Sequence, residues 1–156
     1  MMNAATATAA PLIHPPIAGP VTRATVDLRH VIRFSTGLPG FEACRSFVLM
    51  ASEGNDALHY LTALEGPAAS FLVIDPRRVQ SDYRCELTEG DAERLGVQLM
   101  QAAPLLWLAL VMLEENGTVS VNLRAPVVIN PARMVGQQVI PYNTTYPLRH
   151  VLVQGE

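Results

Sequence analysis

The chain has 156 residues, of which 49% are hydrophobic and 16% charged, which is typical of one compact domain and excludes a disordered chain. Fourteen acidic residues against eleven basic ones, all of them arginine, give a net charge of −3, which argues against nucleic-acid binding. No apolar run approaches the ~20 residues that a membrane-spanning helix requires.

The first twenty residues are rich in alanine, threonine and proline. They lack the basic start and unbroken apolar core of a signal peptide, so we predict a disordered tail over residues 1–20. The two cysteines, Cys44 and Cys85, share no metal-binding or redox spacing, which favours reduced thiols in a cytoplasmic protein. Residues 21–153 show no repeat and no boundary, and we predict that they form a single domain.

Short runs of β-branched and aromatic residues between turn signals predict a series of strands. The strands predicted in the first part of the chain are two within 21–34, followed by 46–51, 58–64, 71–74 and 83–87. The segment 35–42 contains two glycines and a proline, which indicates a fixed turn, but it has no phosphate-loop spacing. Asp75 follows a strand, and we expect its carboxylate to hydrogen-bond the next turn.

One helix is predicted, from Glu89 to Leu95. Thr88 is a suitable N-cap, Asp91 gives a capping-box match three residues later, and Gly96 is expected to end the helix. A helix this short is marginal alone, so it must pack on the sheet. We expect it to cover apolar residues around Trp107.

The segment from Pro104 to Asn130 predicts a β-hairpin around Asn116-Gly117. A two-residue type I′ turn would pair Leu110 with Leu123; a four-residue loop would keep the same faces together. One face is then purely apolar, and the other places Trp107 diagonal to Arg124. That mixed face is either covered by a helix or loop, or exposed as a partner site. The predicted core face contains Leu106, Leu108, Leu110, Met112, Val119, Val121 and Leu123.

Two further strands, 134–140 and 148–153, complete the pattern. It predicts an all-β fold: an antiparallel β-barrel or sandwich of about nine or ten short strands with one short α-helix. The four histidines are scattered, and no HExxH or GxSxG spacing occurs. We therefore predict no catalytic residue, no metal site and no cofactor.

Four blocks of the sequence resemble the flagellar assembly factor FliW family. They are IRF with GLPGFE (32–34 and 37–42), FLVIDP (71–76), NLRAPVVIN (122–130), and GQQVI with YPLRH (136–140 and 146–150). They follow the order and spacing of that family between about Val21 and His150. The segment from Glu89 to Leu113 matches the family in character more than in letters.

The resemblance implies a small cytoplasmic, β-barrel-like protein that binds flagellin. We separately expect a monomer, with no direct contact with nucleic acid because of its net charge and none with a membrane because it has no apolar span. It also implies binding to the translational regulator CsrA when flagellin is scarce, which would relieve repression of the flagellin message. An acidic protein suits an RNA-binding regulator through complementary potential. The candidate partner-binding residues are Phe41, Glu42, Asp75, Trp107, Asn122, Arg124, Tyr146 and Arg149.

A second hypothesis comes from another class of protein. A β-barrel can bind a small ligand, or catalyse a reaction, at its mouth. Such a site would be built on Asp75, Arg124 and Arg149. Direct RNA binding is a third hypothesis, and the net charge disfavours it.

Overall fold

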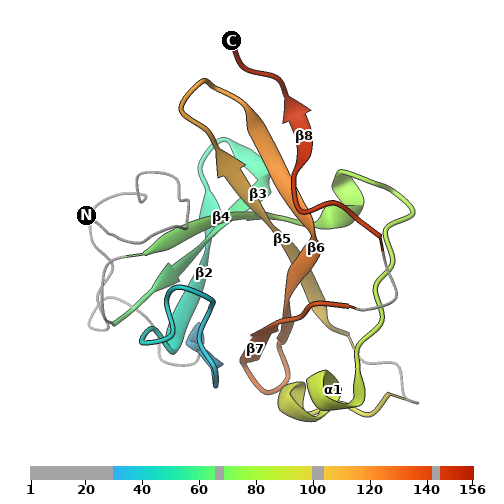
Figure 1. The fold of residues 1–156 in the computed structure, drawn as a ribbon. Coiled ribbons are helices and arrows are strands. Elements are labelled where there is room, and N and C mark those ends of the chain that lie inside the picture. Colours follow the sequence, from blue (N-terminus) through green and yellow to red (C-terminus); the bar gives the residue numbers. More distant parts are fainter. Residues whose placement is uncertain (1–29, 66–68, 100–103, 142–144) are drawn as a thin grey trace.

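The computed structural model describes residues 30–65, 69–99, 104–141 and 145–156. The predicted tail and the first predicted strand, within residues 21–29, lie outside these ranges. None of the helices within them has the length and apolar character needed to cross a bilayer. The elements (Figure 1) are β1 (Ile32–Phe34), β2 (Ser46–Ser52), β3 (Asn55–Ala63), β4 (Ser70–Ile74), the 3-10 helix η4 (Pro76–Arg78), α1 (Glu89–Leu95), β5 (Leu106–Leu113), β6 (Val119–Asn130), β7 (Val135–Gln138) and β8 (His150–Val153).

Strands β1 to β7 close into a seven-stranded barrel. Neighbours from β1 to β7 pair in chain order, and β7 returns to β1 as a parallel pair, with Phe34 opposite Gly136. The predicted all-β fold is therefore confirmed, and of the two predicted architectures, barrel or sandwich, it is the barrel; its other strand pairs are antiparallel. The predicted number of strands is too high for the described ranges, because residues 83–87 form no strand and eight strands are described.

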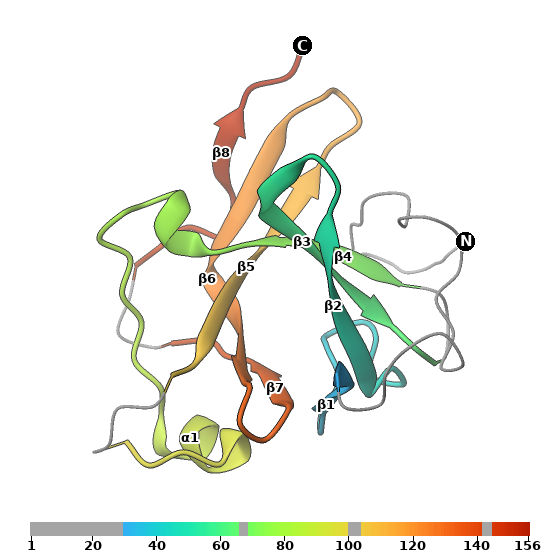
Figure 2. The same cartoon turned by 180° about the vertical axis from the view of Figure 1, so that it is seen from behind.

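Strand β6 changes partner along its length. Its second half, Val127 to Asn130, pairs with β7 inside the barrel, and its first half, Val119 to Val121, pairs with β8. The β5–β6 hairpin and β8 extend beyond the barrel (Figures 1 and 2). We call this extension the arm, and define it as residues 110–122 together with β8.

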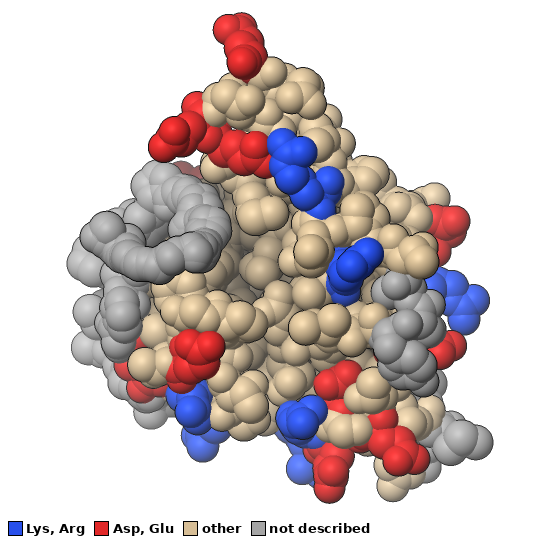
Figure 3. Space-filling model, in the orientation of Figure 1, with Lys and Arg blue, Asp and Glu red and all other residues tan. Residues whose placement is uncertain are grey.

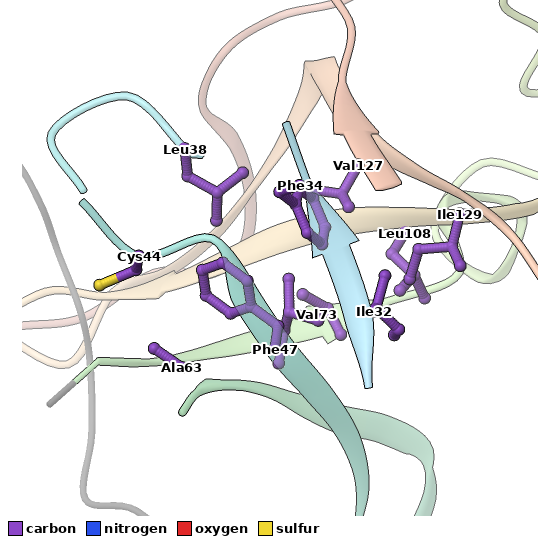
Figure 4. Close-up of a cluster of buried hydrophobic side chains, with 11 residues drawn as sticks. Ile32, Phe34, Leu38, Cys44, Phe47, Ala63, Val73, Leu108, Val127 and Ile129 are labelled. Carbon is purple, nitrogen blue, oxygen red and sulfur yellow. The ribbon is translucent and has the colours of Figure 1, made fainter. Parts of the chain in front are cut away.

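The barrel core is built from side chains of distant strands. Phe34 of β1 lies edge-on to Phe47 of β2, with ring centroids 5.0 Å apart. Figure 4 shows these rings directed toward Val127 of β6 and Val73 of β4. Buried aromatic pairs of this geometry contribute about 0.5–1.5 kcal/mol beyond their burial.

The predicted helix is confirmed at both ends. Thr88 Oγ1 accepts the N–H of Asp91, the Asp91 carboxylate accepts the N–H of Thr88, and Gly96 is the C-cap. Leu95 is fully buried with Val128 and Val139, and Trp107 packs against them. The helix thus covers Trp107, as predicted.

Gly136 lies within β7 instead of interrupting a strand, as the sequence had indicated. A Cβ atom at Gly136 would lie 2.5 Å from Cζ of Phe34. The glycine is required because the ring of its strand neighbour occupies the space of a side chain.

The predicted hairpin register is wrong by one residue. Leu110 lies opposite Asn122, and Leu113 lies opposite Val119. Gly117, at φ 92°, donates its N–H to the Glu114 carbonyl, and the Glu114 N–H donates to Thr118. Only one loop residue takes positive φ, so the loop is a type I turn with a bulge and not the type I′ turn that Asn-Gly favours.

This shift changes which side chains share a face. Val121 and Leu123 pack with Ala109 and Val111, which the sequence had placed on the mixed face. Leu106, Leu108 and Leu110 instead contact the cluster around Phe34 and Phe47. The residues predicted to share one core face therefore lie on two opposite faces of the hairpin, and both faces are covered. Met112, one of these residues, is only half-buried.

Candidate partner-binding site

A bulge of four residues interrupts β6 between the barrel and the arm. Leu108 pairs with Val127, and two residues later Leu110 pairs with Asn122. Residues 123–126 of β6 therefore stand opposite Ala109 alone. We call these four residues, Leu-Arg-Ala-Pro, the β6 bulge.

The side chain of Asn122 replaces the strand pairing that the bulge loses. Its Oδ1 atom accepts the N–H groups of Arg124 and Ala125, each at 3.0 Å. A short amide side chain can fold back onto the backbone two or three residues ahead, which stabilises such a turn. Asn122 thus acts on the backbone of the bulge.

The other polar backbone groups of the bulge bond to residues from distant segments. The Tyr83 hydroxyl donates to the Leu123 carbonyl at 2.7 Å, and Gln138 Nε2 donates to the Ala125 carbonyl at 2.9 Å. Val139 donates its N–H to the Pro126 carbonyl, and Leu123 donates its N–H to Pro147. The bulge interrupts strand pairing, so its backbone N–H and C=O groups would otherwise lack hydrogen-bond partners. Because these bonds supply the partners, the bulge has a defined shape.

Tyr83 is buried beneath the bulge and remains a hydrogen-bond donor at any physiological pH. Burial, and next the hydrogen bond from the Cys85 thiol at 3.0 Å, raise the pKa of the Tyr83 hydroxyl. Its ring stacks on Tyr146, with centroids 4.5 Å apart and planes 26° apart. The Tyr146 hydroxyl accepts the N–H of Arg84. The stack therefore joins the segment 83–85 to the segment before β8.

Arg124 lies on the bulge and is half-buried. Its Nε–H donates to the Tyr146 carbonyl at 2.8 Å. The predicted contact with Trp107 is absent, because Trp107 lies opposite Val128 and under α1. This bond links the bulge to the segment before β8.

Arg149 lies between this cluster and the tip of the arm. It makes a two-point ion pair with Glu114, with distances of 2.7 and 3.0 Å. The hydrogen bonds from Arg149 are the main reason that the pKa of Glu114 is lowered, and they outweigh desolvation. The pair fastens the segment before β8 to the β5–β6 hairpin.

The other predicted contact residues lie elsewhere. The Phe41 ring is edge-on to Phe71 at 5.1 Å, and the Glu42 carboxylate accepts the N–H of Gly40. These contacts stabilise the turn between β1 and β2. Trp107 is part of the packing under the helix.

Asp75 caps the 3-10 helix η4, as the sequence predicted. Its Oδ1 accepts the N–H of Arg77, and its carboxylate also pairs with the Arg77 guanidinium at 3.1 Å. Burial tends to raise the pKa of Asp75, but the combined hydrogen bonds and charges of Arg77 and Arg78 lower it. The carboxylate thus has a local structural role.

Among the eight candidates, the structure gathers Asn122, Arg124 and Tyr146 around one bulge, with Arg149 three residues beyond Tyr146. It adds Tyr83 and Gln138, which sequence reasoning missed. Residues 83–87 had been interpreted as a strand, and a polar side chain that braces a distant bulge has no local pattern. The pair of Glu114 with Arg149 was likewise hidden, because Glu114 was interpreted only as a turn residue.

The three residues predicted for a barrel-mouth site each bond to a nearby group of the protein. Asp75, Arg124 and Arg149 bond to Arg77, Tyr146 and Glu114 respectively. Across the described ranges, His, Cys, Asp and Glu residues form no group of three or more that could hold a metal ion. Cys44 and Cys85 form no disulfide. The polar residues around the bulge therefore brace the backbone and present a surface.

Fold and site together define a closed β-barrel with an appended three-stranded arm and a braced bulge between them. The family model described as FliW protein matches residues 19–152. The chain belongs to the FliW family.

Three similar proteins illustrate this membership. The flagellar assembly factor FliW of Natranaerobius thermophilus is 32% identical over 81% of this chain and 83% of the relative. That of Thermotoga petrophila is 30% identical over 78% and 82%. A structure described as the crystal structure of the flagellar assembly factor FliW superposes with a TM-score of 0.74 at 28% identity, covering 83% of this chain and 89% of that one.

Proposed function

We propose that this chain is a cytoplasmic flagellar assembly factor that binds flagellin and antagonises the translational regulator CsrA by direct protein–protein binding. Binding to flagellin would occupy the protein while flagellin accumulates. Export of flagellin would release it to sequester CsrA. Translation of flagellin would thereby follow assembly of the flagellum.

The observation that carries this proposal is the family match over residues 19–152, which includes every strand of the barrel and most of β8. The relatives in that family are named for an assembly role and not for a reaction. The surface around the bulge supports a protein partner, because arginine and tyrosine are enriched where partners contribute most to binding. The net charge of −3 of this chain would complement a basic, RNA-binding protein such as the regulator that it is proposed to antagonise.

The first test is direct titration. Purified full-length chain is titrated calorimetrically with flagellin and, separately, with CsrA from the same organism. We expect saturable binding to both. Binding to neither protein would exclude the proposed function.

The second test separates action through CsrA from direct action on RNA. In a gel-shift assay at physiological salt, the chain alone should leave the leader RNA of the flagellin message unshifted. Added to a CsrA–RNA complex, it should release free RNA, and prior addition of flagellin should suppress that release. A shift by the chain alone would contradict indirect regulation.

A further inference from the structure

The arm ends in a strand with one open edge. β8 is the last strand in the order of the sheet, and β6 pairs with one of its edges. Within the described ranges no strand pairs with its other edge. An open edge presents backbone N–H and C=O groups to any extended chain that can reach them.

Exposed apolar side chains accompany this edge. Of the six large hydrophobic residues that are exposed in the described ranges, four belong to the arm or lead into β8. Val153 lies opposite Val119, which lies opposite Leu113, so these residues form a row across all three strands of the arm. The four, with their exposed fractions, are Leu113 (48%), Leu148 (54%), Leu152 (43%) and Val153 (55%).

The tip of the arm is acidic. Glu114, Glu115 and Glu156 lie there, and Glu156 is placed by its N–H bond to the Asn116 carbonyl. Arg149 pairs with Glu114 and offsets one of these three charges. Figure 3 shows the acidic side chains at the upper end of the molecule, beside arginine. A basic group on a partner would meet complementary potential at this end.

Two copies of β8 could pair with each other over its four residues. A second copy of this chain also carries a net charge of −3, however, so it would not complement the acidic tip. We propose that β8 instead accepts, by strand addition, an extended apolar segment of a partner protein that carries a basic residue near the tip of the arm. The identity of this partner as flagellin or CsrA rests on the proposed function; the strand-accepting edge does not.

Leu152→Lys tests the edge, because lysine on an edge strand opposes pairing and would repel a basic partner. Ile140→Lys is the matched control, since Ile140 is also exposed, at 68%, but lies outside the arm. Binding of flagellin and of CsrA is measured for wild type and both variants. We expect at least a tenfold loss for Leu152→Lys with one of the partners, and wild-type binding for Ile140→Lys.

A second experiment needs neither natural partner. The probe is a short synthetic peptide of alternating valine and threonine with arginine at one end, and its binding is followed by fluorescence anisotropy. We expect weak binding that Leu152→Lys abolishes and that is several-fold weaker when glutamate replaces the arginine.

These outcomes are distinguishable. If flagellin and CsrA bind Leu152→Lys as tightly as wild type, the edge proposal is overturned while the proposed function stands. If wild type binds neither protein, the proposed function fails, and the peptide experiment then tests the edge proposal alone. Peptide binding that depends on Leu152 supports the edge proposal, and the absence of peptide binding overturns it. A dimer in sedimentation that Leu152→Lys dissociates would also overturn it, by assigning the edge to a second copy.

Discussion

The two halves of β6 differ in sequence and in surroundings: residues 119–122 alternate apolar and polar side chains, whereas residues 127–129 are continuously apolar. Val127, Val128 and Ile129 are all buried, between β5, β7 and the helix. In the arm half Ser120 and Val121 are also buried, but Val119 and Asn122 are only half-buried, and the outer strand of the arm has an open edge. One strand thus stabilises the barrel at one end and presents a surface at the other. The β6 bulge separates the two roles.

The barrel half is also tied to the helix through a polar side chain. Asn130 is buried, its Nδ2 donates to the Leu95 carbonyl at 2.7 Å, and its Oδ1 accepts the N–H of Ala132. A buried amide with both ends satisfied adds specificity to apolar packing. The arm half has buried packing at Val121, but its polar contacts, such as Arg149 with Glu114, are exposed and contribute less. We therefore expect substitutions in the two halves to separate stability from binding.

The largest effect is expected in the barrel half. Ile129→Ala should lower the free energy of unfolding by about 2–5 kcal/mol, because it leaves a cavity in a packed core. Leu113→Ala, at an exposed position on the arm, should change it by less than about 0.5 kcal/mol. Urea denaturation of both variants checks this. Equal losses would show that the arm and barrel are one packing unit.

Arg124 tests the junction between the halves. Arg124→Ala should weaken binding of flagellin or CsrA by about 2 kcal/mol or more, as truncation of a central interface residue does. It should lower stability by only about 1 kcal/mol, because a single hydrogen bond to Tyr146 is lost. Calorimetric titration and denaturation are measured on the same preparations. Arg33→Ala, at an exposed arginine of β1, is the control and should change neither.

Asn122 tests whether the shape of the bulge depends on its cap. Asn122→Ala leaves the N–H groups of Arg124 and Ala125 without their acceptor, which should cost about 1–2 kcal/mol in a part-buried site. Asn122→Asp keeps an acceptor oxygen and should recover most of this stability. If alanine and aspartate behave alike in thermal unfolding, the bulge is determined by Tyr83 and Gln138 instead.

The smallest effect concerns the ion pair on the arm. The folded-state pKa of Glu114 is lowered, so the pair contributes stability above the unfolded pKa, and this contribution is lost as pH falls through the folded pKa. The difference in thermal midpoint between wild type and Glu114→Gln should therefore be present above about pH 5 and vanish well below pH 4. High salt should reduce it. A difference that is constant with pH would exclude the ion pair as its cause.

Local signals were sufficient for the elements whose stability is local. The helix was predicted at about Glu89 to Leu95, the bounds that it has, because its capping box and its terminal glycine act within one turn of the chain. The all-β fold followed from the alternation of apolar and polar residues. The hydrogen bond that the Asp75 carboxylate accepts from the next turn followed from turn chemistry. Family membership followed from four blocks of residues, and the match over residues 19–152 confirms it.

What the sequence left open depends on contacts between distant segments. Asn116-Gly117 is compatible with several hairpin loops, and packing of Ala109 and Val111 with Leu72 and Tyr83 decides the register. The β6 bulge requires Tyr83, Gln138 and Pro147, which lie between 13 and 40 residues along the chain from the bulge residues to which they bond. No local pattern encodes such bonds. The tertiary structure alone therefore decided which face is core, where Arg124 lies, and that β8 keeps an open edge.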